Sequence, residues 1–174
     1  MKIYVQDESQ NNPSGKLFVN VSRGCTYRVE VKTGDRNWAG TAAIVNLHLC
    51  STRNTCFLHI PDLSKFGMAG PSYPYFRLGN HDFFRISTRQ GCQKVCKISI
   101  GHNNAGSSPG WFLDYVKVDV YDGGVVTYRD LFNVYQWIAK GGGYKLQVDV
   151  NHCPVIKAAA AQLASVLPLQ SGVA

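Results

Sequence analysis

The sequence lacks the short patterns that mark common enzymatic sites and membrane-spanning helices. It contains no G-x-S-x-G, no H-E-x-x-H and no glycine-rich phosphate-binding loop. No apolar run reaches the roughly 18 residues that a transmembrane helix needs, and the basic residues are scattered along the chain. These absences argue against a familiar type of enzyme, a transmembrane protein and a nucleic-acid-binding protein. We therefore expect no catalytic residues.

Two absent features bear on how the cysteines are used: a zinc-binding motif and a visible signal peptide. The chain has no C-x2-C pair of the kind that binds zinc, and its first ten residues have no apolar core typical of a signal peptide. Six cysteines in a small chain favour disulfides formed in an oxidising compartment. We expect the secretory pathway, either the endoplasmic reticulum or the extracellular space, with no leader visible in this chain. The alternative is six reduced cysteines, some of them buried.

The sequence does not determine how the cysteines pair. We favour a bridge that joins the start of the first strand to the end of the last strand, because it would close a long loop and restrict the unfolded chain. The remaining cysteines would then pair with near neighbours in the sequence. The predicted bridges are Cys25–Cys153, Cys50–Cys56 and Cys92–Cys96.

The composition indicates one folded domain with a basic surface. The 174 residues are 45% hydrophobic, which is enough for one core and too much for a disordered chain. Eighteen basic and 11 acidic residues give a formal net charge of +7. This charge favours anionic partners such as acidic lipids, although a solvated basic surface without any partner is an open alternative.

Hydrophobic alternation predicts short strands throughout the chain. Tyr27, Val29 and Val31 alternate with charged residues, and apolar residues alternate in the same way at 116–120. Gly123-Gly124 predicts a hairpin turn. Short strands with turn residues between them indicate an antiparallel β-sandwich. The expected strands cover residues 27–31, 43–49, 56–60, 82–86, 95–100, 111–120, 125–128 and 144–150.

The ends of the chain differ in character from this strand-rich region. Residues 1–24 are polar and predict either a tail or an added edge strand. Residues 156–174 form an alanine-rich tail in which a short helix is an alternative to a loose segment. The domain itself is expected to cover residues 25–155.

Four segments of the chain, in the same order, resemble motifs of one known family. ISIGHNNAGSSPGWFLDYVKVDVY at 98–121 follows the pattern G-H-x-N-x-G-x-x-P-x-W-F-L-x-x-V, and 27–41, 76–84 and 132–140 match further motifs. The chain thus resembles PLAT domains, also called lipoxygenase homology or LH2 domains. GMAGPSYPYFRLGN and NHCPV are similar to the small plant stress proteins that consist of one such domain. The resemblance implies an all-β, antiparallel, eight-stranded β-sandwich of two four-stranded sheets.

The same resemblance raises the question of calcium, which some PLAT domains bind between loops. Calcium prefers six to eight oxygen ligands, with carboxylates supplying charge. Several positions that are acidic in many members are neutral here, such as Ala42 and Gly110. We therefore expect no required cofactor and at most weak Ca²⁺ binding. The candidate ligands are Asp35, Gly40, Thr41, Asn103 and Asn104.

Aromatic residues in turns suggest a surface that contacts membranes. Trp38 lies in a turn, and an indole at a loop tip favours the membrane interface. Prolines keep Tyr73 and Tyr75 out of a central strand, so both are expected in an exposed loop. The alternative is that these side chains cover the edge of a core. Trp111 and Trp137 are predicted to be core residues. The predicted membrane- or partner-binding residues are Trp38, Arg36, Lys65, Tyr73 and Tyr75.

These observations predict a non-catalytic module that binds a lipid surface or a protein. The resemblance implies a role in plant stress responses, and in PLAT proteins that are enzymes a separate large domain carries the chemistry. We expect a monomer that contacts anionic lipid or a protein partner and no nucleic acid. The alternatives are a protein–protein adaptor without lipid affinity and a lipid-modifying enzyme.

Overall fold

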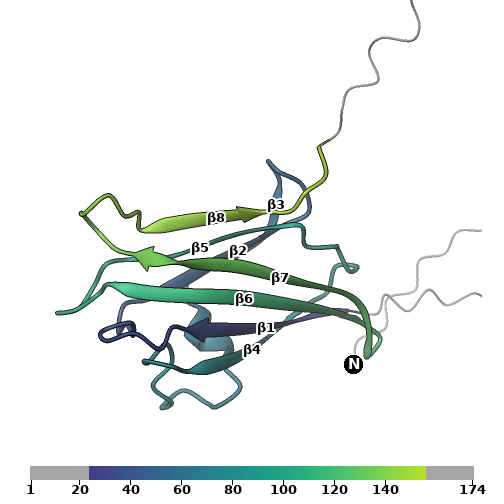
Figure 1. Cartoon of the computed structure of the whole chain (residues 1–174). Helices are drawn as coiled ribbons and strands as arrows, with labels where there is room; N and C mark the ends of the chain where they lie inside the picture. Colours follow the sequence, from purple (N-terminus) through teal and green to yellow (C-terminus); the bar gives the residue numbers. More distant parts are fainter. Residues whose placement is uncertain (1–23, 156–174) are drawn as a thin grey trace, which may run out of the picture.

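A computed structural model describes residues 24–155, which form two antiparallel sheets packed face to face (Figure 1). The first sheet contains, in spatial order, β4 (His81–Thr88), β1 (Cys25–Thr33), β6 (Trp111–Asp122) and β7 (Val125–Ile138). The second contains β3 (Cys56–Ile60), β2 (Val45–Cys50), β5 (Lys97–His102) and β8 (Gln147–Asn151). The predicted eight-stranded β-sandwich of two four-stranded sheets is confirmed.

Helical structure in the described range is limited to the 3₁₀ helix η1 (Leu63–Phe66). No helix within 24–155 is long and apolar enough to cross a membrane. The predictions for 1–23 and 156–174, a tail or edge strand and an alanine-rich tail, lie outside the described residues.

Two strand boundaries differ by three residues or more from those expected, and the others agree within two residues. The strand predicted at 125–128 extends to Ile138, because it pairs with nearly the whole length of β6. The last strand begins at Gln147 rather than at 144, because Gly141, Gly142 and Gly143 all have positive φ and turn the chain first.

The core lies between the sheets and is built from the alternating residues of the central strands. Val116, Val118 and Val120 of β6 are at most 1% exposed. In its pairing with β1, strand β6 has one extra residue, Asp114, which forms a bulge between Leu113 and Tyr115. The bulge allows Trp111 and Leu113 to face the core as well, on the same side as the valines.

Trp111 is fully buried, as predicted, and its Nε1 donates a hydrogen bond to Thr33 Oγ1 at 3.0 Å. The prediction that Trp137 is a core residue is wrong. Trp137 lies opposite Phe112 in the β6–β7 pairing, and the two rings meet edge to face at 5.5 Å on the outer side of the sheet. The side chain is partly exposed there.

Three disulfides join the six cysteines: Cys25–Cys92, Cys50–Cys56 and Cys96–Cys153. The predicted Cys50–Cys56 bridge is confirmed, and the predicted Cys25–Cys153 and Cys92–Cys96 bridges are wrong. Cys25 begins a strand of the first sheet, whereas Cys153 follows β8 in the second sheet. Cys96 directly precedes β5, and the β5–β8 pairing aligns Lys97 with Asn151, which places Cys96 beside Cys153.

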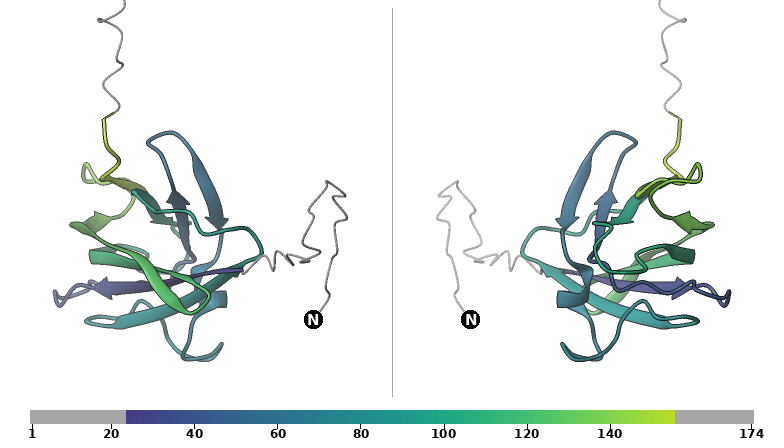
Figure 2. Two further views of the ribbon diagram at one scale, coloured as in Figure 1. Left: turned by 90° about the vertical axis from the view of Figure 1, so that its right-hand side faces the viewer. Right: turned by 90° about the vertical axis from the view of Figure 1, so that its left-hand side faces the viewer.

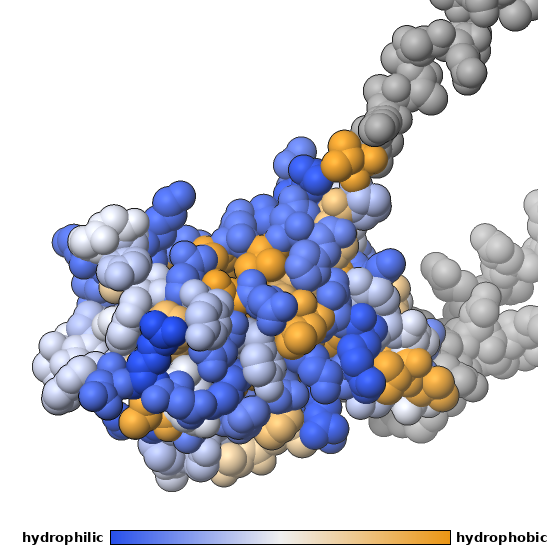
Figure 3. All heavy atoms as spheres, in the orientation of Figure 1, coloured by the Kyte–Doolittle hydropathy of each residue, from blue (hydrophilic) through white to orange (hydrophobic). Residues whose placement is uncertain are grey.

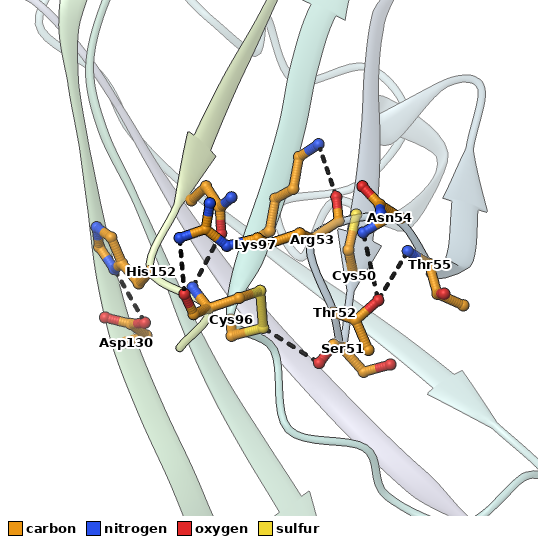
Figure 4. The surroundings of a disulfide bond; sticks show 12 residues. Cys50, Ser51, Thr52, Arg53, Asn54, Thr55, Cys96, Lys97, Asp130 and His152 are labelled. Atoms are coloured by element: carbon orange, nitrogen blue, oxygen red, sulfur yellow. Dashed lines mark hydrogen bonds and ion pairs between the residues drawn. A yellow bond between two sulfur atoms is a disulfide. The ribbon is translucent and has the colours of Figure 1, made fainter. Parts of the chain in front are cut away.

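All three disulfides lie at one end of the sandwich, which we call the stapled end. Here β1 and β5 begin and β2 and β8 end. Figure 4 shows Cys50, Arg53 and Cys96 close together at this end. Arg53 Nη2 donates to Cys153 O at 3.5 Å, and Lys97 Nζ donates to Arg53 O at 3.3 Å.

The opposite end carries the longer connections, and we call it the loop end. Its segments are residues 34–44, 61–80, 103–110 and 139–146. These segments lie on the left in Figure 1, and the right-hand view of Figure 2 looks onto them. Chain segments far apart in the sequence are therefore neighbours at this end.

The connectivity of the disulfides can be checked by tryptic mapping without reduction. Cleavage after Lys94 separates Cys92 from Cys96, so the structure predicts a linked peptide pair for Cys25–Cys92 and another for Cys96–Cys153. A peptide containing Cys25 linked to one containing Cys153 would contradict the structure.

Replacing Cys25 and Cys92 by serine opens a 67-residue loop and should lower the free energy of unfolding by about 4 kcal/mol, measured by denaturant titration.

Candidate loop-end binding site

Trp38 is the most exposed large hydrophobic side chain among residues 24–155, at 85%. Its φ of 66° lies in the left-handed region, which non-glycine residues adopt only when the surroundings hold them there. The next residue, Ala39, fixes this conformation because it is fully buried. The Ala39 N–H donates to Arg36 O at 3.0 Å, and the Ala39 carbonyl accepts from Phe112 N at 2.9 Å. The turn thus fixes an exposed indole on a buried anchor.

Arg36 lies on an aromatic platform beside this turn. Its guanidinium carbon is 4.0 Å from the centre of the Phe112 ring and 5.2 Å from that of Tyr135. Its Nη2 also donates to Tyr135 Oη at 3.2 Å. Phe112 in turn packs edge to face against Tyr135 and Trp137. We call Arg36, Phe112, Tyr135 and Trp137 the aromatic–arginine cluster.

Sequence reasoning missed Tyr135 and Trp137 as members of this site. Tyr135 is 68% exposed and, like Trp38, has a positive φ, of 47°. The available signal was their spacing: two aromatics two residues apart in one strand share a face. Which face they share depends on the register shift in the β6–β7 pairing, where Val134 and Tyr135 of β7 both lie opposite Asp114. The sequence pattern did not reveal this shift.

Exposed apolar side chains and positive charge occur together at the loop end. The four loop segments contain five basic and two acidic residues. Figure 3 shows many pale residues of intermediate hydropathy at this end, on the left, which is the colour expected of Trp, Tyr and Gly. The large hydrophobic side chains exposed in these segments are Trp38, Ile44, Phe66, Met68, Tyr73, Leu78 and Tyr144. Tyr135 of β7 is exposed next to Arg36.

The structure separates the remaining predicted binding residues. Tyr73 is 38% exposed and its ring packs against that of Tyr75 at 4.8 Å. Tyr75 is buried, so its predicted exposure is wrong: its Oη accepts from Ala69 N at 3.0 Å and donates to Gly70 O at 3.1 Å. Lys65 is exposed on η1 near Asp62, with 3.8 Å between Nζ and Oδ2, and not in the aromatic–arginine cluster.

The loop containing Tyr75 is held by a buried carboxylate. Asp82, at the start of β4, is 1% exposed and accepts hydrogen bonds from Phe76 N and from Asn80 Nδ2. Burial raises the pKa of Asp82, and the two hydrogen bonds oppose that rise only in part. The carboxylate therefore serves to position the 76–80 turn.

A lysine ammonium lies where the first candidate calcium ligand would act. Lys32 Nζ is 3.0 Å from both carboxylate oxygens of Asp35. It also donates to Thr33 O at 2.9 Å and to Gly79 O at 3.0 Å. The oxygens that gather around Asp35 thus already surround a positive charge that belongs to the chain.

The other candidate ligands are engaged in holding the loops together. Thr41 Oγ1 donates to Pro109 O at 2.9 Å and accepts from Ala43 N at 3.0 Å. Asn103 Oδ1 accepts from Ile44 N and Ala105 N, both at 3.1 Å. These contacts use the oxygens that a cation would need.

Gly40 and Asn104 have backbone roles at the same loops. Gly40 packs so closely that a Cβ would lie 2.8 Å from Leu78 N. Asn104 has a φ of 58° and donates its N–H to His102 Nδ1 at 3.1 Å. Residues 24–155 contain no group of three or more His, Cys, Asp or Glu side chains placed to hold a metal ion. The candidate residues therefore do not fit a calcium site.

This arrangement predicts how the protein responds to calcium and to loss of Lys32. Millimolar Ca²⁺ should leave the melting temperature of the protein essentially unchanged, because a ligand raises it only by binding the folded state. Lys32→Met should lower the free energy of unfolding by about 2 kcal/mol, because Asp35 and two carbonyls lose a charged donor. The exposed Lys140→Met is the control in denaturant titrations. A calcium-dependent rise in the melting temperature of the unmodified protein would contradict this assignment.

Comparison with known proteins places the fold in a family. Residues 27–150 match the family model described as the PLAT/LH2 domain. PLAT domain-containing protein 1 of Arabidopsis thaliana is 28% identical over 146 residues, which cover 82% of this chain and 79% of the relative. PLAT domain-containing protein 2 of the same plant is 30% identical over 135 residues, covering 75% and 72%.

Solved structures agree on the fold. The crystal structure of coral 8R-lipoxygenase, described as showing calcium activation via a C2-like domain, superposes with a TM-score of 0.54 at 20% identity. The match covers 72% of this chain and 16% of the lipoxygenase chain, so it involves only a small part of that enzyme. Since the family model spans most of the sequence and the strands form the matching sandwich, the chain belongs to the PLAT/LH2 domain family.

Proposed function

We propose that this domain is a non-catalytic module that attaches to anionic lipid surfaces through its loop end. The observation that carries the proposal is Trp38, an indole that is 85% exposed on a turn anchored by buried Ala39. Exposing a large apolar ring costs free energy in water, and the interface of a bilayer is the environment that indoles prefer. The aromatic–arginine cluster extends the same surface.

The charges of the loop end support anionic lipid as the target. Five basic residues against two acidic ones occupy its segments, and of the acidic ones Asp35 is already paired with Lys32. A basic residue near an anionic membrane contributes roughly 1 kcal/mol to binding. Aromatic insertion and charge attraction therefore act at the same end of the molecule.

The roles of the reactive side chains support binding rather than catalysis. All six cysteines are in disulfides, which leaves no thiol nucleophile. Buried His102 uses both ring nitrogens in hydrogen bonds to backbone groups of Ile138 and Asn104.

The disulfides also support the secretory pathway or the extracellular space as the location of the protein. The similarity to small plant stress proteins adds a role in stress responses to the proposal.

Vesicle co-sedimentation tests the proposal. The protein should bind phosphatidylserine-containing vesicles, bind neutral phosphatidylcholine vesicles much more weakly, and lose binding as salt is raised. Trp38→Ala should weaken binding about tenfold, because it removes the burial of one aromatic side chain. Val125→Ala is the matched control, since Val125 is 67% exposed at the stapled end.

Tryptophan fluorescence gives an independent readout of insertion. Trp111 is fully buried and Trp137 is partly covered by Phe112, so a blue shift on adding vesicles should come from Trp38 and disappear in Trp38→Ala. Absence of binding to every vesicle would overturn lipid attachment and favour the adaptor function. Equal losses in Trp38→Ala and Val125→Ala would show that the loop end is not the contact surface.

A further inference from the structure

The outer face of the first sheet carries a row of arginines that the loop end does not use. In the strand register, Arg28 of β1 lies directly opposite Arg85 of β4 on one side and Asp119 of β6 on the other. Asp119 is in turn opposite Arg129 of β7. Directly opposed residues in antiparallel strands share a face. The row therefore crosses all four strands with three arginines and one aspartate.

The single carboxylate of this row is already committed. Arg129 Nε donates to Asp119 Oδ1 at 2.6 Å and its Nη2 donates to Oδ2 at 3.2 Å, a bidentate pair. The hydrogen bond to Asp119 raises the pKa of Arg129. Both oxygens of Asp119 therefore already accept a hydrogen bond from Arg129, and no ion pair joins Asp119 to Arg28.

The nearest acid of the adjoining row is committed as well. Glu30 accepts a hydrogen bond from Tyr115 Oη at 2.7 Å and lies 3.2 Å from His81 Nδ1 and 3.6 Å from Lys117 Nζ. Burial alone would raise the pKa of Glu30. The hydrogen bonds from Tyr115 and His81 and the charge of Lys117 outweigh burial, so the pKa is lower than usual and Glu30 remains ionised. Its charge is thus balanced by groups other than Arg28.

Arg28 and Arg85 are left as a like-charge pair. Within residues 24–155, neither guanidinium is within ion-pair distance of a carboxylate. Both side chains are exposed, and Arg28 lies over the ring of Phe83 with 5.3 Å to its centre. Opposed like charges on a sheet are destabilising. An anion between them would remove this repulsion.

A hollow lies over the same residues. Its volume is about 210 Å³. Three basic residues, Arg28, Lys117 and Arg129, line it together with the paired carboxylates Glu30 and Asp119 and the rings of Phe83 and Tyr121. Arg85 does not line the hollow but lies next to Arg28 in the strand register. This volume is smaller than the roughly 300–1,000 Å³ of pockets for drug-sized molecules. The hollow therefore suits one compact charged group rather than a large ligand.

We propose that this arginine row is a binding site for a phosphate monoester group. Guanidinium groups present planar pairs of N–H donors that match phosphate oxygens, and they stay charged at every physiological pH. The phosphate would lie over β1, with Arg28 as the central contact and Arg85 and Lys117 beside it. The site is on a sheet face, whereas the proposed lipid contact is at the loop end.

Calorimetric titration with inorganic phosphate and with glycerol phosphate tests the site. The protein should bind both, and Arg28→Gln and Arg85→Gln should each weaken binding about tenfold, because each removes a charge-assisted hydrogen bond. Arg53→Gln is the control, because it removes the same charge from an exposed residue at the stapled end. Trp38→Ala should leave phosphate binding unchanged, which separates this site from the proposed lipid contact.

Thermal unfolding supplies a second readout. Without phosphate, Arg28→Gln should raise the melting temperature slightly, because it removes the repulsion from Arg85. With phosphate, the added rise should be clearly smaller in Arg28→Gln and in Arg85→Gln than in the unmodified protein. Failure to bind phosphate, or equal weakening in Arg28→Gln and Arg53→Gln, would overturn the proposal.

The source of the phosphate group is distinguished by a vesicle arm. If phosphatidic acid vesicles compete with glycerol phosphate and Arg28→Gln abolishes the competition, the group is presented by a lipid. If glycerol phosphate binds and the vesicles do not compete, the ligand is a soluble ester. Either result supports the phosphate site at Arg28.

Discussion

The bulged pairing of β6 with its neighbours is the constraint on which both candidate sites depend. The bulge at Asp114 allows Trp111, Leu113 and the three valines to face the core together. The same bulge turns Phe112 outward, where it supports Arg36. Further along the strand, it places Lys117 and Asp119 on the outer face beside Arg28. The bulge at Asp114 thus determines which residues of β6 face solvent on either side of it.

The two ends of the sandwich are stabilised in different ways. Disulfides close the stapled end, where they restrict the unfolded chain. The loop end is held by hydrogen bonds between loops, such as those of Thr41 and Asn103. Covalent restraint at one end leaves the other free to present exposed aromatic groups without carrying the stability of the whole domain. Trp38 can remain in an unfavourable backbone conformation because the surrounding loops are fixed.

Local patterns in the sequence were sufficient for the sheets but not for contacts that depend on register. Alternation in 27–31 and 116–120 predicted the central strands, and the turn around Trp38 predicted an exposed indole. The prolines beside Tyr75 predict an exposed loop, but the sequence pattern does not show that the Tyr75 hydroxyl hydrogen-bonds to the backbone of Ala69 and Gly70. The disulfide bridges depend on which strands are neighbours in a sheet. The arginine row depends on which residues of neighbouring strands lie opposite each other. Neither is a local property.

The ammonium of Lys32 has a consequence for how the loop end is controlled. A dissolved ion comes and goes with its concentration, so a surface organised by it is ready only when the ion is abundant. A charge attached to the chain cannot diffuse away, so the oxygens of Thr33, Asp35 and Gly79 have a partner that does not depend on the calcium concentration. Under the proposed function, the loop end would therefore bind its target without a cation signal, and its attachment would depend only on the amounts of the protein and of that target.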